Sequence, residues 1–101
     1  MKYLYDGGNL KISLNEELDM NSCRELRQVI DGYIMKYQPN EVTFDLSNVN
    51  FMDSSGIGLI IGRYNLIKLL DSKLTILNPS EPIKRIIELS SLGRNITLRC
   101  S

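Results

Sequence analysis

The chain has 101 residues, with twelve basic and twelve acidic side chains, so its formal net charge at pH 7 is zero. This balance argues against nucleic acid or an anionic membrane as the main partner, because both favour proteins with a basic face. The length predicts one domain, residues 1–101, with a single hydrophobic core.

The sequence contains no histidine. Ser-His-Asp triads, histidine-based zinc sites and histidine phosphorelays are therefore excluded, and the commonest general base near neutral pH is absent. Cys23 and Cys100 lack the spacing of metal ligands, and we expect neither a metal nor a cofactor. Cys23 falls in a helical apolar stripe, which favours a buried, inert thiol over a redox centre.

The sequence has no segment suited to a membrane or to secretion. Its longest apolar run, residues 56–62, is far shorter than the roughly 18 residues needed to cross a bilayer. The N-terminal segment MKYLYDGGNLK lacks the apolar core of a secretory signal. We therefore expect a cytoplasmic protein without membrane contact.

Residues 2–15 predict a β-hairpin, because apolar and polar side chains alternate on both sides of the turn DGGN at residues 6–9. From residue 21 the apolar positions recur every three or four residues, as on one face of a helix. They are Cys23, Leu26, Ile30, Tyr33, Ile34 and Tyr37. We expect Asn21 or Ser22 to cap this helix, with Ser22 and Glu25 as a capping box, and residues 38–40 to end it.

Residues 41–49 predict a strand, and a second helix is expected to begin at Ser54 or Ser55 and to run to about Leu70. The apolar positions of this second helix are Ile57, Ile60, Ile61, Tyr64, Ile67 and Leu70. Residues 73–77 predict a short buried strand, and residues 95–99 a last one.

The third helix is expected to start at Ser80, with Pro82 in its first turn, and to stop at Gly93. The resulting order is β-β-α-β-α-β-α-β. It predicts an α/β fold with a mainly parallel sheet of four to five strands, helices packed on it and an antiparallel N-terminal hairpin.

The segment FMDSSGIGLIIG, residues 51–62, places an aspartate, two serines and three glycines where a buried apolar run is expected. Its G-x-G-x-x-x-G spacing is one residue too long for a dinucleotide fingerprint, and no P-loop motif is present. We interpret Gly58 and Gly62 as positions that let the helix lie close to the sheet or to another helix. Neither serine has a glycine two residues before it, which excludes a nucleophile elbow.

Two interpretations of the serines stay open. At the junction between a strand and a helix, Ser54 or Ser55 can be a plain N-cap that bonds a backbone N–H. The same position favours a phosphate, because free N–H groups and the helix dipole attract negative charge. Ser54 is expected to be exposed at the carboxyl ends of the strands, where a kinase can reach it.

The segment FMDSSGIGLIIGRYN closely resembles the signature of the STAS domain family, in particular the bacterial anti-sigma factor antagonists. The pattern is the strand VTFDLSNVNF, then D-S-[ST]-G-[ILM]-G, then a helix. The segments LNEELDMNS around Asp19 and KLTILNPSEPIKRIIELSSLG also match, so the resemblance covers almost the whole chain. The letters GRY look most like the sporulation sigma-F branch.

The resemblance implies a function as a substrate and not as an enzyme. In such proteins the first serine of the motif, here Ser54, is phosphorylated by a partner that is both a serine kinase and an anti-sigma factor. The unphosphorylated antagonist binds this partner and frees the sigma factor, whereas the phosphorylated form does not bind until a PP2C-type phosphatase restores it. ATP belongs to the kinase. The acidic residue that contacts the kinase falls on Asp19, whose other interpretation is a cap at the entry of the first helix.

A partner-binding surface follows from the resemblance and from the residues near Ser54. Asp53 is interpreted as orienting the loop or contacting the partner, and Ser55 as a cap or a neighbour in the contact surface. Arg63 is either a partner contact or a solvated helix charge. The predicted partner-binding set is Asp19, Asp53, Ser55, Gly56, Gly58 and Arg63.

The sequence departs from the family pattern at two places. Glu16 stands where members usually have glycine, which bears on the loop before Asp19. Members also commonly finish with a further amphipathic helix, so one face of the sheet is expected to be less covered. Two alternatives stay open: a STAS module of general stress signalling or a stressosome, and a nucleotide-binding or hydrolytic enzyme. A third, the cytosolic tail of an anion transporter, would require membrane spans, which we do not expect in this sequence.

Overall fold

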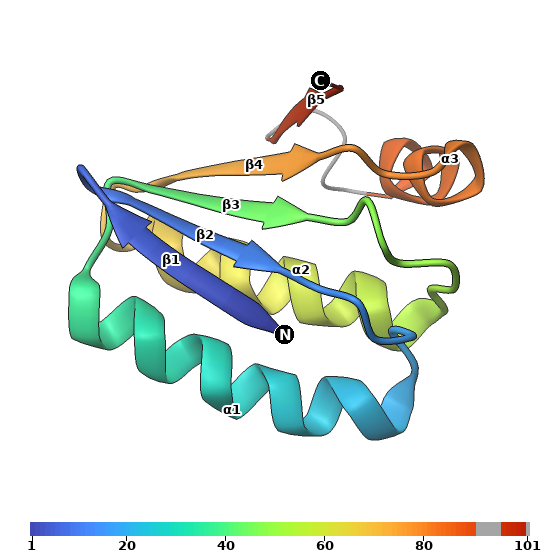
Figure 1. The fold of residues 1–101 in the computed structure, drawn as a ribbon, viewed down its shortest axis with the longest axis horizontal. Coiled ribbons are helices and arrows are strands. Elements are labelled where there is room, and N and C mark those ends of the chain that lie inside the picture. Colours follow the sequence, from blue (N-terminus) through green and yellow to red (C-terminus); the bar gives the residue numbers. More distant parts are fainter. Residues whose placement is uncertain (91–95, 101) are drawn as a thin grey trace.

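The computed structural model describes residues 1–90 and 96–100. Over these residues the chain forms a five-stranded sheet and three helices (Figure 1). In chain order the elements are β1 (Lys2–Asp6), β2 (Asn9–Ser13), α1 (Met20–Tyr37), β3 (Glu41–Asp45), α2 (Ser54–Lys68), β4 (Lys73–Leu77), α3 (Glu81–Leu89) and β5 (Thr97–Arg99). This is the predicted order. The expected helix stop, Gly93, and the expected first residue of the last strand, Asn95, lie outside the described residues.

The strands lie in the order β1-β2-β3-β4-β5, so each strand is a neighbour of the next one in the sequence. Only the β1–β2 pair is antiparallel, and the other three pairs are parallel. The predicted α/β fold, with a mainly parallel sheet and an N-terminal hairpin, is therefore confirmed. The hairpin turns at Gly7 and Gly8, whose φ angles of 58° and 87° are the two positive values that a type I′ turn requires.

The core lies between the sheet and the helices. Figure 1 shows α1 and α2 side by side under the same face of the sheet. On this face β2, β3 and β4 present side chains that are at most 2% exposed: Leu10, Ile12, Val42, Phe44, Leu74 and Ile76. The predicted apolar face of α1 is also confirmed, because Cys23, Leu26, Ile30 and Ile34 are buried.

The opposite face of β2, β3 and β4 carries polar side chains that bond across the strands. Asn9 Nδ2 donates to Glu41 Oε1 over 3.3 Å, and Thr75 Oγ1 donates to Glu41 Oε2 over 2.7 Å. Lys11 Nζ lies 3.8 Å from Asp45 Oδ2. Thr43 and Thr75 of this face are buried, at 7% and 3% exposure, so these polar contacts stabilise the face from within.

Both long helices are capped by an aspartate, although α2 begins at Ser54, as predicted. The N-cap of α1 is Asp19, in an extended backbone conformation, and not Asn21 or Ser22. Its capping box pairs Asp19 with Ser22, so the expected box between Ser22 and Glu25 is wrong. A carboxylate at residue 19 can accept hydrogen bonds from the free N–H groups of the first turn as well as a hydroxyl can.

The buried stripe of α2 differs from the predicted one. Its buried residues are Gly56, Leu59, Ile60, Arg63 and Ile67. The predicted positions Ile57, Ile61, Tyr64 and Leu70 are only partly buried. Because α2 packs against both the sheet and α1, its environment, and not its apolar period alone, decides which side faces the core.

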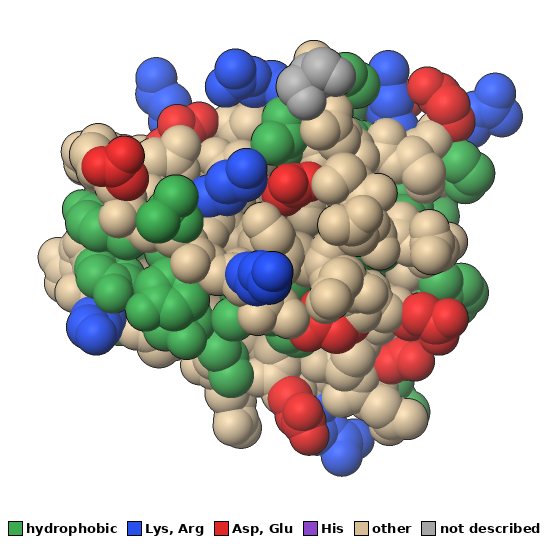
Figure 2. All heavy atoms as spheres, viewed as in Figure 1, with side chains coloured by type: hydrophobic (Ala, Val, Ile, Leu, Met, Phe, Trp, Pro, Cys, Tyr) green, Lys and Arg blue, Asp and Glu red, His purple; other side chains and the backbone are tan. Residues whose placement is uncertain are grey.

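Ser80 is the N-cap of α3, as predicted, and Pro82 lies in the first turn. The Ser80 side chain makes no capping hydrogen bond. No helix of the described residues is long and apolar enough to span a bilayer. On the face drawn in Figure 2, basic and acidic side chains are interspersed, as the zero net charge suggests.

Candidate functional site

The segments that lead into α1 and α2 lie side by side. Leu18 and Met52 form an isolated parallel β-bridge. The Leu18 N–H donates to the Phe51 carbonyl over 2.9 Å, and the Asp53 N–H donates to the Leu18 carbonyl over 3.2 Å. Asp19 and Asp53 each follow a bridged residue. The tertiary structure therefore brings these two predicted site residues together at neighbouring helix starts.

Each aspartate caps the helix that follows it. Asp19 Oδ1 accepts from the Ser22 N–H over 3.0 Å, and the Asp19 N–H donates to Ser22 Oγ over 3.3 Å. Asp53 Oδ1 accepts from the Ser55 N–H over 2.7 Å. The bond from Ser22 lowers the pKa of Asp19 despite some desolvation. The interpretation that Asp53 orients the loop through backbone N–H groups is confirmed, and Asp19 is a helix cap.

Ser54 is the first residue of α2, and its side chain is exposed. Its hydroxyl makes no hydrogen bond to another residue in the described part of the chain. Because Asp53 is the cap of α2, the interpretation of Ser54 or Ser55 as N-cap is wrong. The Ser55 N–H is used in the cap, and its side chain is half-buried. Ser54 thus presents a hydroxyl that the fold does not use for capping.

Gly56 is buried directly beneath this helix start. A Cβ atom at this position would lie 2.5 Å from Met52 Cγ and 2.9 Å from Leu18 Cβ. Real Cβ atoms do not approach other atoms so closely. Only glycine therefore allows α2 to sit on the Leu18–Met52 bridge. Gly56 supports the surface around Ser54 from below, and its own direct contact with a partner stays a prediction.

Gly58 and Gly62 do not have the packing role that their spacing suggested. A Cβ atom at either position would meet nothing within 4 Å. The two glycines line an open groove of about 1030 Å³ between α1 and α2. Ser55 lies in the same groove, and so do the arginine side chains of Arg24 and Arg27.

Arg63 lines the groove from α2 and is only 5% exposed. Its Nε lies 2.6 Å from Oδ1 of Asp31 in α1, but the N–H does not point along a hydrogen bond, so the contact is an ion pair. Burial lowers the pKa of Arg63, the Asp31 carboxylate counteracts this, and Arg27 adds to it. The interpretation of Arg63 as a solvated helix charge is therefore wrong, while its contact with a partner stays a prediction.

The sequence reasoning missed Asp31 as the counterion and Arg24 and Arg27 as groove residues. A helical wheel places Arg24, Arg27 and Asp31 on one side of α1, at spacings of three and four. That signal does not say that α2 lies opposite. Only the packing of α1 on α2 gives Asp31 a buried arginine to neutralise.

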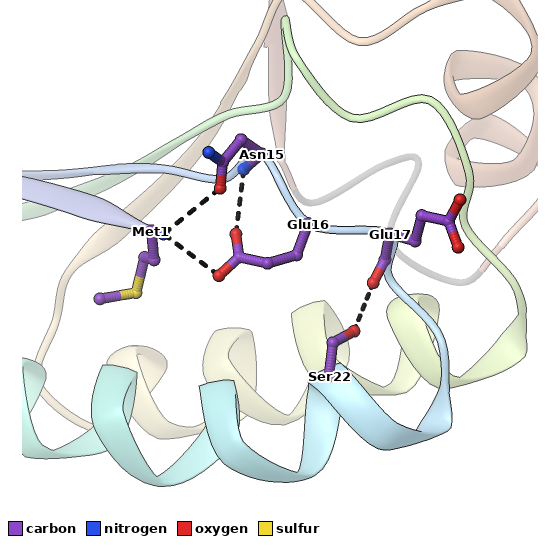
Figure 3. A network of polar contacts seen from close by, with 5 residues as sticks. All are labelled: Met1, Asn15, Glu16, Glu17 and Ser22. Atoms are coloured by element: carbon purple, nitrogen blue, oxygen red, sulfur yellow. Dashed lines mark hydrogen bonds and ion pairs between the residues drawn. The ribbon is translucent and has the colours of Figure 1, made fainter.

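Glu16 shapes the loop before Asp19 through hydrogen bonds (Figure 3). Its carboxylate accepts from the Asn15 N–H over 3.0 Å and from the amino group of Met1 over 3.2 Å. Desolvation raises the pKa of Glu16, but these bonds outweigh it and the pKa is lowered. Glu16 does not adopt a left-handed backbone, so glycine is not required here. Nearer the helix, Ser22 Oγ donates to the Glu17 carbonyl.

Cys23 is buried and carries a free thiol, as predicted. Desolvation raises its pKa, and the nearby carboxylates of Asp53 and Asp19 raise it further. The thiolate that redox or metal chemistry needs is therefore disfavoured. Within the described ranges, no three His, Cys, Asp or Glu side chains are placed to hold a metal ion.

The site combines an exposed hydroxyl, that of Ser54, with two capping carboxylates. Two carboxylates, Asp19 and Asp53, already bond backbone N–H groups. An exposed hydroxyl at a helix start can receive a phosphate from another protein, because the helix dipole favours negative charge there.

The comparisons with known proteins agree on one family. The model of the STAS domain matches residues 4–101. The anti-sigma F factor antagonist of Paenibacillus polymyxa is 34% identical over 85 residues, which cover 84% of this chain and 73% of that protein. An anti-sigma-B factor antagonist of Staphylococcus epidermidis is 32% identical over 82 residues, 81% of this chain and 75% of that protein.

Solved structures show the same fold. The anti-sigma factor antagonist SpoIIAA in its unphosphorylated form has a TM-score of 0.83 at 26% identity, covering 96% of this chain and 85% of that one. The Bacillus cell fate determinant SpoIIAA in its phosphorylated form has a TM-score of 0.77 at 26% identity, covering 96% of this chain and 88% of that one.

Proposed function

The chain belongs to the STAS domain family, and from this premise we propose that it is an anti-sigma factor antagonist controlled by phosphorylation of Ser54. In the unphosphorylated form it binds an anti-sigma factor that is also a serine kinase, which releases a sigma factor. The names of its relatives, which are antagonists of anti-sigma F and anti-sigma-B factors, support this proposal.

The observation that carries the proposal is the exposed Ser54 hydroxyl at the start of α2. Capping of α2 is performed by Asp53, so a phosphate on Ser54 replaces no bond that holds the helix. A similar solved protein, SpoIIAA, exists in a phosphorylated form. The modification therefore needs no unfolding of α2.

The switch is electrostatic. A phosphate adds about −1.5 to −2 charges at neutral pH. In a docked interface this charge would lie beside Asp53 and close to the segment that carries Asp19, where like charges disfavour a close fit. A loss of about 2–3 kcal/mol lowers the affinity for the anti-sigma factor roughly 30- to 150-fold, which is enough to release it.

The chain is a substrate in this scheme and has no catalytic residue of its own. ATP is bound by the partner kinase, a PP2C-type phosphatase removes the phosphate, and the exchange takes place in the cytoplasm. Asp19, Asp53, Ser55 and Gly58 surround Ser54 or line the adjoining groove, and we propose them as the partner surface. Gly56 and Arg63 shape this surface from within.

The test is phosphorylation of the chain by its anti-sigma factor kinase, with ATP, followed by peptide mapping. We expect one phosphate on Ser54 and none on the Ser54→Ala variant. Ser80→Ala is the matched control, because Ser80 is also exposed at a helix start and makes no capping bond. Modification of Ser80 or of another serine in place of Ser54 would contradict the proposal.

The anti-sigma-B branch is a second candidate, because its members are almost as similar as the anti-sigma F antagonists, at 32% against 34% identity. Titration of the chain with the purified anti-sigma factors of both pathways distinguishes them. The cognate partner is the one whose binding is abolished by phosphorylation of Ser54.

A further inference from the structure

The outer edge of the sheet at β1 is open. β1 is the terminal strand of the sheet order, and all five of its residues are exposed. Asp6 and Asn9 close the two-residue turn of the hairpin, and such a closing pair exchanges two backbone hydrogen bonds. Along the two strands, hydrogen-bonded and non-hydrogen-bonded pairs then alternate. The N–H and C=O groups of Tyr3 and Tyr5 therefore point away from β2, toward solvent.

The sequence of β1, Lys2-Tyr3-Leu4-Tyr5-Asp6, is complementary to itself when it is read in the opposite direction. We propose that β1 is a docking edge for a second copy of this chain, with the two β1 strands paired antiparallel about Leu4. The two sheets then form one continuous sheet, by the strand addition that exposed edges commonly support.

The backbone and the charges select the same register. Tyr3 and Tyr5 carry the outward N–H and C=O groups, so these residues must form the bonded pairs. With Leu4 opposite Leu4, Tyr3 of one copy lies opposite Tyr5 of the other, and both tyrosines of each copy are used. Lys2 then lies opposite Asp6 of the second copy, in a non-bonded pair, where side chains are closer.

A shift by two residues would lose this match. Lys2 or Asp6 would then lie opposite Leu4, and one tyrosine of each copy would pair beyond the end of β1. Lysine on an edge strand usually discourages self-association. Here the opposite charge of Asp6 removes that obstacle in one register only, which is why we infer a specific dimer and not an open chain of sheets.

The two faces of the paired strands suit this arrangement. Tyr3 stacks on Tyr33 with ring centroids 4.0 Å apart, and Tyr5 stacks on Tyr37 at 4.5 Å. Figure 2 shows hydrophobic side chains gathered along β1 and the adjoining part of α1. These stacks hold both tyrosines on the helix side, so Lys2, Leu4 and Asp6 point to the other face. There the new ion pairs would extend the polar side-chain contacts between β2, β3 and β4.

Sedimentation of the full chain over a concentration series tests the proposal. We expect a monomer–dimer equilibrium, and Lys2→Glu should raise the dissociation constant about tenfold or more, because two attractions become two repulsions. The double variant Lys2→Asp/Asp6→Lys should restore the dimer, since it reverses every charge and keeps the complementarity. Lys68 is exposed on α2, so Lys68→Glu makes the same change in net charge away from β1. This control variant should leave the dissociation constant of the dimer unchanged.

A disulfide tests the register. In a Cys100→Ser background, Leu4→Cys should form a cross-linked dimer under mild oxidation, because non-bonded antiparallel pairs bring Cα atoms to about 4.5 Å. Lys2→Cys should not cross-link, since the two Lys2 positions are about 13 Å apart in this register. Circular dichroism confirms folding of each variant. A monomer at concentrations up to about 1 mM, or equal cross-linking at residues 2 and 4, would overturn the proposal.

Discussion

Leu18 and Met52 form a parallel β-bridge that joins the segments just before the two capping aspartates. The bridge lies outside the named strands, and Gly56 packs directly on both residues. The place of Ser54 at the surface thus depends on one tight contact beneath it.

Replacement of Gly56 by alanine should lower the free energy of unfolding by about 1–3 kcal/mol, because the new methyl group overlaps Met52 and Leu18. Urea denaturation followed by circular dichroism measures the change. Gly58→Ala is the matched control. It has open space around its Cβ and should raise stability by about 0.5–1 kcal/mol, since alanine favours helix interiors. Equal effects of the two changes would argue against the close packing at Gly56.

The Asp19 cap should make stability depend on acid. Hydrogen bonding from Ser22 lowers the pKa of Asp19 in the folded chain, so the unfolded chain takes up the proton first as the pH falls. The contribution of Asp19 is complete above the unfolded pKa of about 3.9, and it is lost as the pH falls through the lower folded pKa.

Asp19→Asn isolates this charge effect, because asparagine is as good an N-cap as aspartate. The free energy of unfolding of this variant should match that of the wild type near neutral pH. Between about pH 5 and pH 2 it should fall less than that of the wild type. Denaturation at several pH values measures the difference. Parallel pH profiles for the two proteins would show that the charge of Asp19 has no part in acid stability.

Removal of the Asp31 carboxylate should destabilise the chain, because Arg63 then keeps a buried charge without a counterion. We expect Asp31→Asn to cost about 1–3 kcal/mol, at the low end for a buried pair since Asp31 is partly exposed. Adding Arg63→Met should recover part of this loss, so the double variant is more stable than the sum of the single effects predicts. Additive losses would mean that the two side chains act independently.

Ser54 variants should separate binding from phosphorylation. Ser54→Asp should weaken binding to the anti-sigma factor at least tenfold, because a fixed negative charge joins Asp53 at the interface. Ser54→Ala should bind like the unmodified chain and accept no phosphate. Calorimetric titration with the purified partner gives both affinities. Binding of the Ser54→Asp variant as tight as that of the wild type would contradict the electrostatic switch.

Local features of the sequence were enough to predict the order of the strands and helices. The glycines at residues 7 and 8 readily adopt the two positive φ angles of a tight hairpin turn, and they placed the hairpin correctly. The apolar period of α1 was equally informative, because this helix has one buried side and one exposed side. The motif around Ser54 also placed that serine at the junction of a strand and a helix, which the fold confirms.

The helix caps and the glycine roles were not predictable in this way. Several residues near each helix start can act as a cap, and the pairing of Leu18 with Met52 decides that Asp19 and Asp53 do so. Gly56, Gly58 and Gly62 look alike in the sequence, yet only Gly56 meets a neighbouring segment at close range.

Short-range patterns of apolar and turn residues are enough to predict the fold class and to place Ser54 at the junction of a strand and a helix. The tertiary structure alone decided that Arg63 is buried against Asp31, that two capping aspartates meet beside Ser54, and that β1 lies at an open edge. These relationships join residues that are far apart in the chain. Their energies depend on the surfaces that come into contact when the helices pack on the sheet.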